Sequence, residues 1–391
     1  INYSPAIVSS TKMMPPTTRT TRLAIFALLL SVCLAFKQTT FSSHEVRQVP
    51  TRREVLMSME DSSEAVSPDR RDFLIKGGVA AGALTIGKVI MDGPQYTGTP
   101  DLTGKVVVVT GANTGLGKAS AARLARLGAE VCLACRSPEK AEAAAAEIRA
   151  STGNAAVSTV PLDLASLASV RACAAELGRR YPRIDVLQNN AGVMALPKRT
   201  LTTDGFEYQF GVNHLGHFLL TNLLMGSLLK AERPRIVNLS SAAHQIPPGT
   251  VDFEDLMGEK DYQPWKAYGQ SKLANILFTK ELQRRLDART DAATAMCCHP
   301  GGVRTELGRN LDLPAWALPL LVPLVYFTKS VEQGAQTQTR LSADPALHRV
   351  GAGKYFDNCA EAQPAPPALD AAAARRLWEV SEELTGQRFE I

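Results

Sequence analysis

The sequence predicts an α/β fold in which helices cover both faces of a doubly wound parallel sheet. From about residue 101, short apolar runs alternate with longer amphipathic segments, which is the order of βαβ units. The first run, 105–109, reads Lys-Val-Val-Val-Val, and a β-branched run of this kind is typical of a strand buried on both faces. A glycine-rich turn follows directly and leads into a helical pattern.

The remaining elements follow in the same alternating order. Strands are predicted at 105–109, 131–135, 157–161, 184–188, 235–239 and 292–298. Helices are predicted from the glycine turn to about 127, at 139–149, 167–180 and 208–229, and around Tyr268 after a polar loop at 242–266. We expect a single domain at 96–391, preceded at 1–95 by a largely disordered targeting presequence.

The turn after the first strand has the spacing G-x-x-x-G-x-G over residues 111–117. Glycines let the backbone approach a ligand closely, and the N-terminus of the next helix offers free N–H groups to a phosphate. A strand, a glycine turn and a helix form the context of a dinucleotide-binding loop in a Rossmann-type fold. A purely structural turn is the alternative.

Arg136 follows the second predicted strand. Many NAD enzymes have an acidic residue here that binds the ribose 2′-hydroxyl, whereas an arginine suits the 2′-phosphate of NADP(H). The sequence therefore favours NADP(H), with an ordinary solvent-facing arginine as the alternative.

Other candidate ligand-binding residues also follow strands, beyond whose carboxyl ends doubly wound sheets bind ligands. Asp163 and Leu164 are expected near an adenine ring. The Asn-Ala-Gly stretch at 190–192 follows the fourth strand, and the turn at 299–305 could close over a nicotinamide carboxamide.

Tyr268 and Lys272 lie four residues apart on a predicted helix, and therefore on one face of it. A phenol titrates near pH ~10, and a neighbouring ammonium favours the phenolate, so we expect the lysine to lower the pKa of the tyrosine. Such a tyrosine can donate a proton to a carbonyl oxygen or accept one from an alcohol. Packing and solvation are the alternative explanation for a bare pair.

Together these motifs resemble the short-chain dehydrogenase/reductase family over roughly residues 102–386. The resemblance is carried by Thr110-Gly111-x3-Gly115-x-Gly117, Asn190-Ala191-Gly192, Asn213, Ser241, Tyr268-x3-Lys272 and Pro300-Gly301. Within the family the chain looks most like the retinol-dehydrogenase-like group, through Ala134-Cys135-Arg136 and the stretches 213–221, 271–275, 299–305, 353–356 and 377–381.

The resemblance implies roles for the matching residues. Tyr268 would donate or accept the proton, Lys272 would bind the nicotinamide ribose, and Ser241, rather than Ser240, would hydrogen-bond the substrate oxygen. Asn213 would hold a water of a proton relay. The residues expected to bind the cofactor are Gly111, Asn113, Thr114, Gly115, Leu116, Gly117, Arg136, Asp163, Leu164, Asn190, Ala191, Gly192, Tyr268, Lys272, Pro300, Gly301, Val303 and Thr305.

The implied function is the NADP(H)-dependent interconversion of a carbonyl and an alcohol by hydride transfer. Light-dependent protochlorophyllide reductases are related and form a first alternative, but they carry a cysteine in the loop before the catalytic tyrosine, and 242–266 contains none. A second alternative is a non-catalytic NADPH-binding subunit or redox sensor of a plastid membrane complex. The intact Tyr268, Lys272, Ser241 and Asn213 argue against it.

In this family a substrate lid follows Pro300-Gly301. Here the segment 311–327 is apolar and contains three prolines, which prevent a long regular helix. Its character suits a small lipophilic substrate, such as a retinoid, isoprenoid or carotenoid-derived carbonyl, or docking to a membrane surface. A segment that packs in the core is the alternative.

The first residues resemble address signals. Arginines precede a short apolar run at 23–36, as in a signal peptide, and 36–53 has the composition of a transit peptide. This order resembles the presequences of complex plastids. Arg70 and Arg71 before a mild apolar stretch, 77–87, resemble a twin-arginine signal, so we expect thylakoid association, with this stretch as a membrane tether. An amphipathic linker is the alternative.

Charge and composition exclude several other classes. The formal net charge is only +5, and the body of the chain contains no basic run, so no nucleic-acid partner is expected. Seven scattered cysteines do not form a disulfide framework, and Cys132 and Cys135 are expected to pack within a strand. The six histidines have no zinc-binding spacing, so no metal is assigned.

Overall fold

The computed structural model describes residue 93, residues 95–303 and residues 328–389, all within one structural unit. Thr305, the apolar segment at 311–327 and nearly all of the predicted presequence lie outside the described residues.

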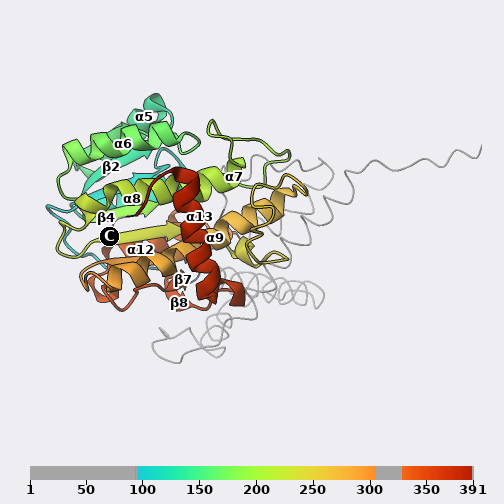
Figure 1. The fold of residues 1–391 in the computed structure, drawn as a ribbon. Helices are drawn as coiled ribbons and strands as arrows, with labels where there is room; N and C mark the ends of the chain where they lie inside the picture. The colour runs from blue at the N-terminus through green and yellow to red at the C-terminus, as the bar shows by residue number, and fades with distance from the viewer. Residues whose placement is uncertain (1–92, 94, 304–327, 390–391) are drawn as a thin grey trace, which may run out of the picture. The chain divides into compact units, whose positions relative to one another are not determined.

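An eight-stranded sheet forms the centre of this unit (Figure 1), with the strand order β3-β2-β1-β4-β5-β6-β7-β8. Its strands are β1 (Val106–Thr110), β2 (Glu130–Cys135), β3 (Val157–Pro161), β4 (Val186–Asn189), β5 (Arg235–Leu239), β6 (Thr294–His299), β7 (Tyr355–Asp357) and β8 (Ala360–Ala362). Every pairing is parallel except that of β7 with β8. The predicted doubly wound sheet is confirmed. The chain order reverses between β1 and β4, and ligands of such sheets bind at the carboxyl ends beside this point.

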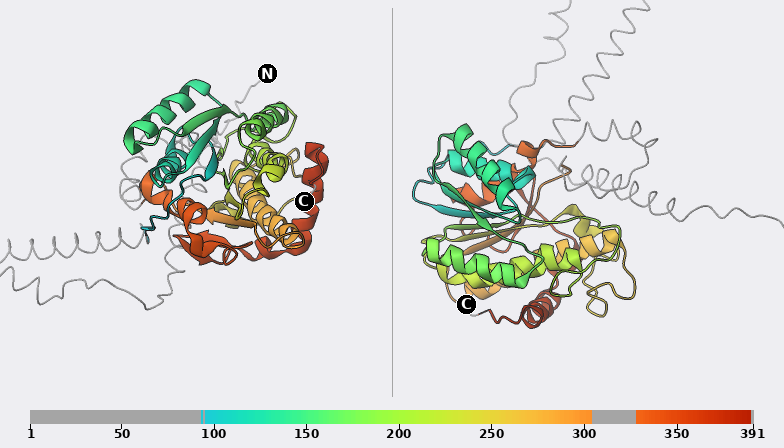
Figure 2. Two further views of the ribbon diagram at one scale, coloured as in Figure 1. Left: turned by 90° about the vertical axis from the view of Figure 1, so that its left-hand side faces the viewer. Right: turned by 90° about the horizontal axis from the view of Figure 1, so that it is seen from above.

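Helices cover both faces of the sheet (Figure 2). One face carries α4 (Gly115–Arg126), α5 (Pro138–Thr152) and α12 (Gln336–Ala343), and the other carries α6 (Leu167–Arg180), α8 (Gly216–Leu228) and α9 (Pro264–Asp287). The last helix, α13 (Ala371–Thr385), packs against α9. Shorter elements are α7 (Tyr208–Phe210), η1 (Gly211–Leu215), η2 (Ala242–Gln245), α11 (Val331–Gly334), η5 (Pro345–Leu347) and η6 (Pro366–Leu369).

The valine run of β1 is buried on both of its faces, as its composition predicts. Val108 packs in the core between the sheet and α6 and α8, whereas Val107 and Val109 pack in the core on the α4 and α5 side. All three side chains are completely inaccessible to solvent. This burial anchors the strand from which the glycine turn emerges.

The predicted helix at 208–229 is interrupted. Between α7 and α8 the backbone forms one π-helical turn, η1, and Asn213 lies fully buried within it. Just after this turn, a Cβ atom on Gly216 would lie 2.8 Å from the carbonyl oxygen of Leu164, so α8 packs too closely against the segment after β3 for any residue but glycine at this position. π-turns inside α-helices are frequent at functional sites.

The loop before Tyr268 differs from the expected polar loop at 242–266. α9 begins earlier, at Pro264, because proline is favoured in the first turn of a helix, where its missing N–H costs nothing. A 3₁₀ turn, η2, opens the loop, and Phe253 and Leu256 pack against the hydrophobic core beside α9. These apolar contacts hold the loop against the helix that carries the candidate catalytic residues.

The last helix completes the core on the outer side of α9. Trp378 is 1% exposed, and its ring packs against Phe218, Phe278 and Phe389, with the Phe389 ring centroid at 4.6 Å. The guanidinium of Arg285 lies 4.3 Å from the Trp378 ring centroid. Truncation of a buried aromatic side chain of this kind costs about 3–5 kcal/mol. Within the described ranges, no helix combines the length and the apolar character needed to cross a membrane.

Candidate active site

The glycine turn between β1 and α4 fits a dinucleotide because its glycines have no room for side chains. Gly111 has φ +65°, and a Cβ atom there would lie 2.9 Å from the Cα of Ala191. A Cβ on Gly117 would lie 2.5 Å from Asn190 Nδ2. Thr114, the N-cap of α4, makes no side-chain capping hydrogen bond, so the first N–H groups of the helix remain for a pyrophosphate.

Thr110 ties this turn to the end of β4. In the sequence, Thr110 belongs to the glycine motif but has no assigned role. Its Oγ1 accepts hydrogen bonds from the backbone N–H groups of Asn190 (2.9 Å) and Ala191 (3.0 Å). Asn190 Nδ2 donates in return to the Thr110 carbonyl at 2.8 Å. Gln338 of α12, which sequence reasoning missed, donates to Asn190 Oδ1 at 3.2 Å and to the Leu116 carbonyl at 3.1 Å. It has no motif of its own, so no sequence signal pointed to it.

The residues expected around the adenosine end lie at the carboxyl ends of β2 and β3. Arg136 is exposed, and its Nη1 donates to the hydroxyl of Tyr208 at 3.3 Å. Asp163 Oδ1 accepts from the N–H of Ala165 at 3.0 Å, and Leu164 is buried. The structure therefore leaves a positive charge facing solvent at this edge.

Tyr268, Lys272 and Ser241 come together at the carboxyl ends of β4 and β5. Tyr268 and Lys272 are each 4% exposed, and the Lys272 ammonium lies 5.7 Å from the Tyr268 ring centroid. Lys272 Nζ donates to the Leu239 carbonyl at 3.2 Å. Ser240 donates its hydroxyl to the Lys272 carbonyl at 2.7 Å, whereas Ser241 lies close enough to Tyr268 to lower its pKa. Of the two serines, Ser241 is thus the one beside the tyrosine hydroxyl.

The expected effect of Lys272 on Tyr268 is wrong for this arrangement. Burial raises the pKa of Tyr268 to about 12, and the nearby Ser241 hydroxyl only partly offsets this rise. Burial likewise lowers the pKa of Lys272 to about 8. Desolvation therefore sets the direction of the shift, and the Lys272 ammonium donates to the Leu239 carbonyl. Tyr268 is therefore protonated at neutral pH and suited to donate a proton.

The side chain of Asn213 makes three hydrogen bonds. Its Oδ1 accepts from the N–H of Val193 at 2.8 Å, and its Nδ2 donates to the Val193 carbonyl at 3.0 Å and to Ser271 Oγ at 2.9 Å. A Cβ on Gly192 would lie 3.1 Å from Asn213 Oδ1 and 3.4 Å from Lys272 Nζ. The residue fastens the segment after β4 to α9: both of its amide hydrogens are used and Oδ1 already accepts one bond, so its main-chain carbonyl is the acceptor that we assign to a relay water.

The turn after β6 is held by a buried lysine. Gly301 has φ +85°, and a Cβ there would lie 2.9 Å from the side chain of Lys329. Lys329 donates its backbone N–H to the Gly302 carbonyl at 2.7 Å and pairs with Val303 in a parallel bridge. A Cβ on Gly334 would meet the side chains of both Val303 and Leu116, so the turn after β6 lies beside the start of α4.

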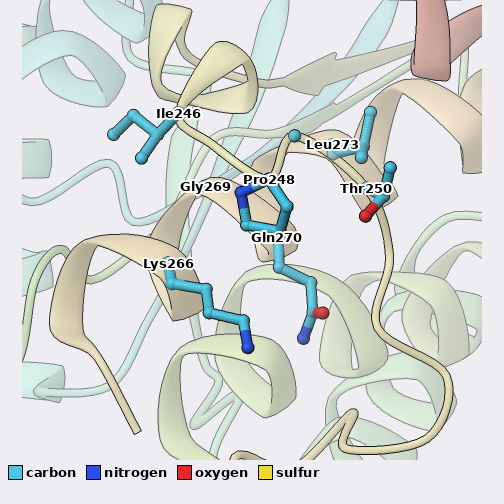
Figure 3. Close-up of a pocket in the computed structure, with 8 residues that line it drawn as sticks. Ile246, Pro248, Thr250, Lys266, Gly269, Gln270 and Leu273 are labelled. Atoms are coloured by element: carbon cyan, nitrogen blue, oxygen red, sulfur yellow. The ribbon is translucent and has the colours of Figure 1, made fainter. Parts of the chain in front are cut away.

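A separate small pocket lies beside α9 (Figure 3). It is lined by Ile246, Pro248, Gly249, Thr250, Lys266, Gly269, Gln270 and Leu273 and does not include the candidate catalytic side chains. A Cβ on Gly269 would lie 2.6 Å from the Ala243 carbonyl oxygen. This close contact seats η2 on α9 and so places Ser241 next to Tyr268.

The other polar candidates are structural. Cys132 and Cys135 are buried and unpaired, and they pack in cores on opposite faces of the sheet. In the part of the chain that the structure describes, no group of histidine, cysteine and acidic side chains could hold a metal ion.

The combined geometry defines a class of protein. The glycine turn forms a phosphate cradle at one end of this sheet edge, and a protonated, buried tyrosine lies beside a serine at the other end. These are the parts of a nicotinamide-dinucleotide-dependent oxidoreductase.

Comparison with known proteins identifies the family. A family model for short chain dehydrogenases matches residues 105–315. Human retinol dehydrogenase 13 is 48% identical over 313 residues, which cover 79% of this chain and 93% of that protein. Mouse retinol dehydrogenase 14 is 47% identical over 323 residues, covering 78% and 95%. The chain belongs to the short-chain dehydrogenase/reductase family, in its retinol-dehydrogenase-like subgroup.

Solved structures agree with this assignment. A protein of Mycobacterium paratuberculosis is 37% identical, with a TM-score of 0.62 over 76% of this chain and 100% of that chain. A short chain dehydrogenase of Escherichia coli, solved with NADPH, is 25% identical, with a TM-score of 0.53 over 68% of this chain and 100% of that chain.

The glycine cradle yields a first testable prediction. Gly117→Ala should weaken NADPH binding roughly tenfold or more, because its methyl group would displace Asn190 and close the phosphate cradle. Gly226→Ala is the matched control, since it lies in α8 with nothing within 4 Å, and it should raise the free energy of unfolding by about 0.5–1 kcal/mol. NADPH fluorescence titration and urea unfolding measure the two effects. Unchanged NADPH affinity in Gly117→Ala would contradict the cradle.

Proposed function

We propose that this protein is an NADP(H)-dependent oxidoreductase that interconverts a carbonyl and an alcohol on a small lipophilic substrate. The observation that carries the proposal is the buried Tyr268, which lies beside Ser241 at the sheet edge that also holds the glycine cradle. The retinol dehydrogenases named above support a lipophilic substrate, because they share nearly half of their residues with this chain.

The roles of the protein's own groups follow from their positions. The hydroxyls of Tyr268 and Ser241 would bind one substrate oxygen, and Tyr268, protonated at neutral pH, would donate its proton to that oxygen during reduction. A bound nicotinamide supplies or accepts the hydride. Lys272 would hydrogen-bond the ribose beside it, and the main-chain carbonyl of Asn213 would accept a hydrogen bond from a relay water.

Replacement of the tyrosine tests whether the protein is an enzyme. Tyr268→Phe should lower turnover by roughly 10²–10⁴-fold and leave NADPH binding intact, because only the proton donor is lost. The assay is NADPH oxidation by the full chain with retinoid, apocarotenoid and chlorophyll-derived carbonyls, compared with small polar carbonyls. Reduction of only the polar compounds would contradict a lipophilic substrate. An NADPH-binding redox sensor would bind the cofactor, turn over none of these compounds and keep its cellular role in the variant.

The preference for NADP(H) rests on Arg136. It lies at the end of β2 with its charge exposed to solvent. The E. coli relative was solved with NADPH, whereas a 3-ketoacyl-(acyl-carrier-protein) reductase of Brucella melitensis, 24% identical, was solved with NADH. The residue at the end of β2, and not the shared fold, therefore carries this part of the proposal.

Arg136→Gln should weaken the binding of NADPH roughly 10–100-fold and leave that of NADH nearly unchanged, because a charge-assisted contact to the 2′-phosphate is lost. Arg179→Gln, on the far part of α6 with its side chain 72% exposed, is the control for loss of one surface charge. Titration of both dinucleotides against both variants measures the effect. An equal loss for NADPH and NADH would show that Arg136 does not read the phosphate.

We also propose that residues 1–95 direct the protein to a plastid and its thylakoid membranes. The support is the order of a signal-like apolar run, a transit-like segment and a pair of arginines. Fractionation of plastid-containing cells that produce the full chain should recover it with thylakoids. Recovery outside plastids, or wholly in the stroma, would contradict this proposal.

A further inference from the structure

His217 lies fully inside the protein, between the π-turn and the glycine turn. It is 2% exposed and stands four residues after Asn213. Its Nδ1 lies 3.1 Å from the main-chain carbonyl oxygen of Asn213, and its Nε2 lies 2.9 Å from Thr110 Oγ1. One imidazole therefore joins the candidate relay carbonyl to the residue that opens the cofactor turn.

The hydrogen bonds around Thr110 define which ring nitrogen carries the proton. Thr110 Oγ1 already accepts from the N–H groups of Asn190 and Ala191, so both of its lone pairs are used. Its own proton must go to His217 Nε2 at 2.9 Å or to the Gln188 carbonyl at 3.3 Å. The shorter contact makes Nε2 an acceptor, so the proton of the neutral ring lies on Nδ1 and is donated to Asn213.

The neutral form of the ring agrees with its surroundings. Burial lowers the pKa of His217 to about 4, and the nearby Lys272 ammonium acts in the same direction. A neutral imidazole with Nδ1–H is both a donor and an acceptor, as the two contacts require.

The contact matters because of what remains of Asn213. Val193 and Ser271 use both amide hydrogens of its side chain, and Oδ1 accepts from Val193, so its main-chain carbonyl is the acceptor assigned to the reaction. A carbonyl oxygen has two lone pairs. If His217 occupies one, the other has a defined direction, and the π-turn cannot relax without breaking the link to Thr110.

We propose that His217 is a positioning residue for the reaction: it orients the carbonyl of Asn213 and locks the π-turn to the glycine turn through Thr110. This inference rests on the proposed function, because the carbonyl serves chemistry only if Tyr268 transfers a proton. His217 itself touches neither substrate nor cofactor.

A matched control lies three residues earlier on the same segment. His214 is also buried, at 1% exposure, but its Nε2 lies 2.9 Å from Ser381 Oγ of α13, on the side away from the glycine turn. Loss of either imidazole should therefore lower the free energy of unfolding, whereas only loss of the His217 imidazole should affect the reaction.

The kinetic test compares His217→Phe, His217→Asn and His214→Phe in the full chain. His217→Phe should lower kcat roughly tenfold, with a smaller change in the KM for NADPH and an increased solvent isotope effect on kcat, because one hydrogen bond to the relay carbonyl is lost. His217→Asn should restore most of kcat, since its amide nitrogen can occupy the place of Nδ1. His214→Phe should keep the kcat of the native protein.

Three kinetic outcomes would overturn the inference: an unchanged kcat in His217→Phe, a His217→Asn protein as slow as His217→Phe, or an equal loss of kcat in His214→Phe. Urea unfolding of all three variants identifies any that fail to fold, and the tautomer measurement below does not depend on them.

A spectroscopic test separates this inference from the proposed function. Histidine-selective ¹⁵N NMR of the full chain should show the His217 ring neutral, with the proton on Nδ1, from pH 6 to pH 8. A proton on Nε2 would overturn the positioning role whatever the protein reduces. If the protein reduced no carbonyl at all, the proposed function would fail, even with the tautomer as expected.

Discussion

The close approach of two backbone segments, the glycine turn after β1 and the Asn-Ala-Gly end of β4, is the constraint on which the site depends. No Cβ atom fits at Gly111 or Gly117, because Ala191 and Asn190 occupy that space. Thr110 fastens the two segments because its Oγ1 accepts hydrogen bonds from the backbone N–H groups of Asn190 and Ala191. The phosphate cradle and the catalytic edge are therefore parts of one packed unit at the point where the order of the strands reverses.

The catalytic end of the site is rigid because its polar groups are buried and satisfied. Asn213 joins the end of β4 to Ser271 on α9, and Ser240 joins β5 to the same helix. Burial disfavours charge on both Tyr268 and Lys272, so it raises the pKa of the tyrosine and lowers the pKa of the lysine. The protein thus holds a neutral proton donor in place before any ligand arrives, and no reorganisation of polar groups is needed.

Much of the fold could be predicted from the sequence, and the reasons are local. β3, α6 and β5 have the predicted bounds because apolar runs and clear helix caps define them. β7 and β8 could not be predicted, because a strand of three residues carries no periodic signal. The π-turn could not be predicted either, because one extra residue in the turn leaves the pattern of apolar residues almost unchanged. The pKa of Tyr268 was predicted in the wrong direction because spacing on a helix describes proximity and not desolvation. Gln338 enters through a tertiary contact that no motif encodes, and His217, although it lies in the 213–221 stretch, acts through a contact with Thr110 that the stretch does not reveal.

The packing of α13 has a consequence for how variants of the gene should be read. Trp378 and Phe389 cover the rings of Phe218 and Phe278, which belong to the two helices that carry or adjoin the catalytic residues. A premature stop codon just before Ala371 would spare every catalytic side chain and yet strip these rings of their cover. Alleles that remove α13 are therefore better classed as null alleles than as benign polymorphisms.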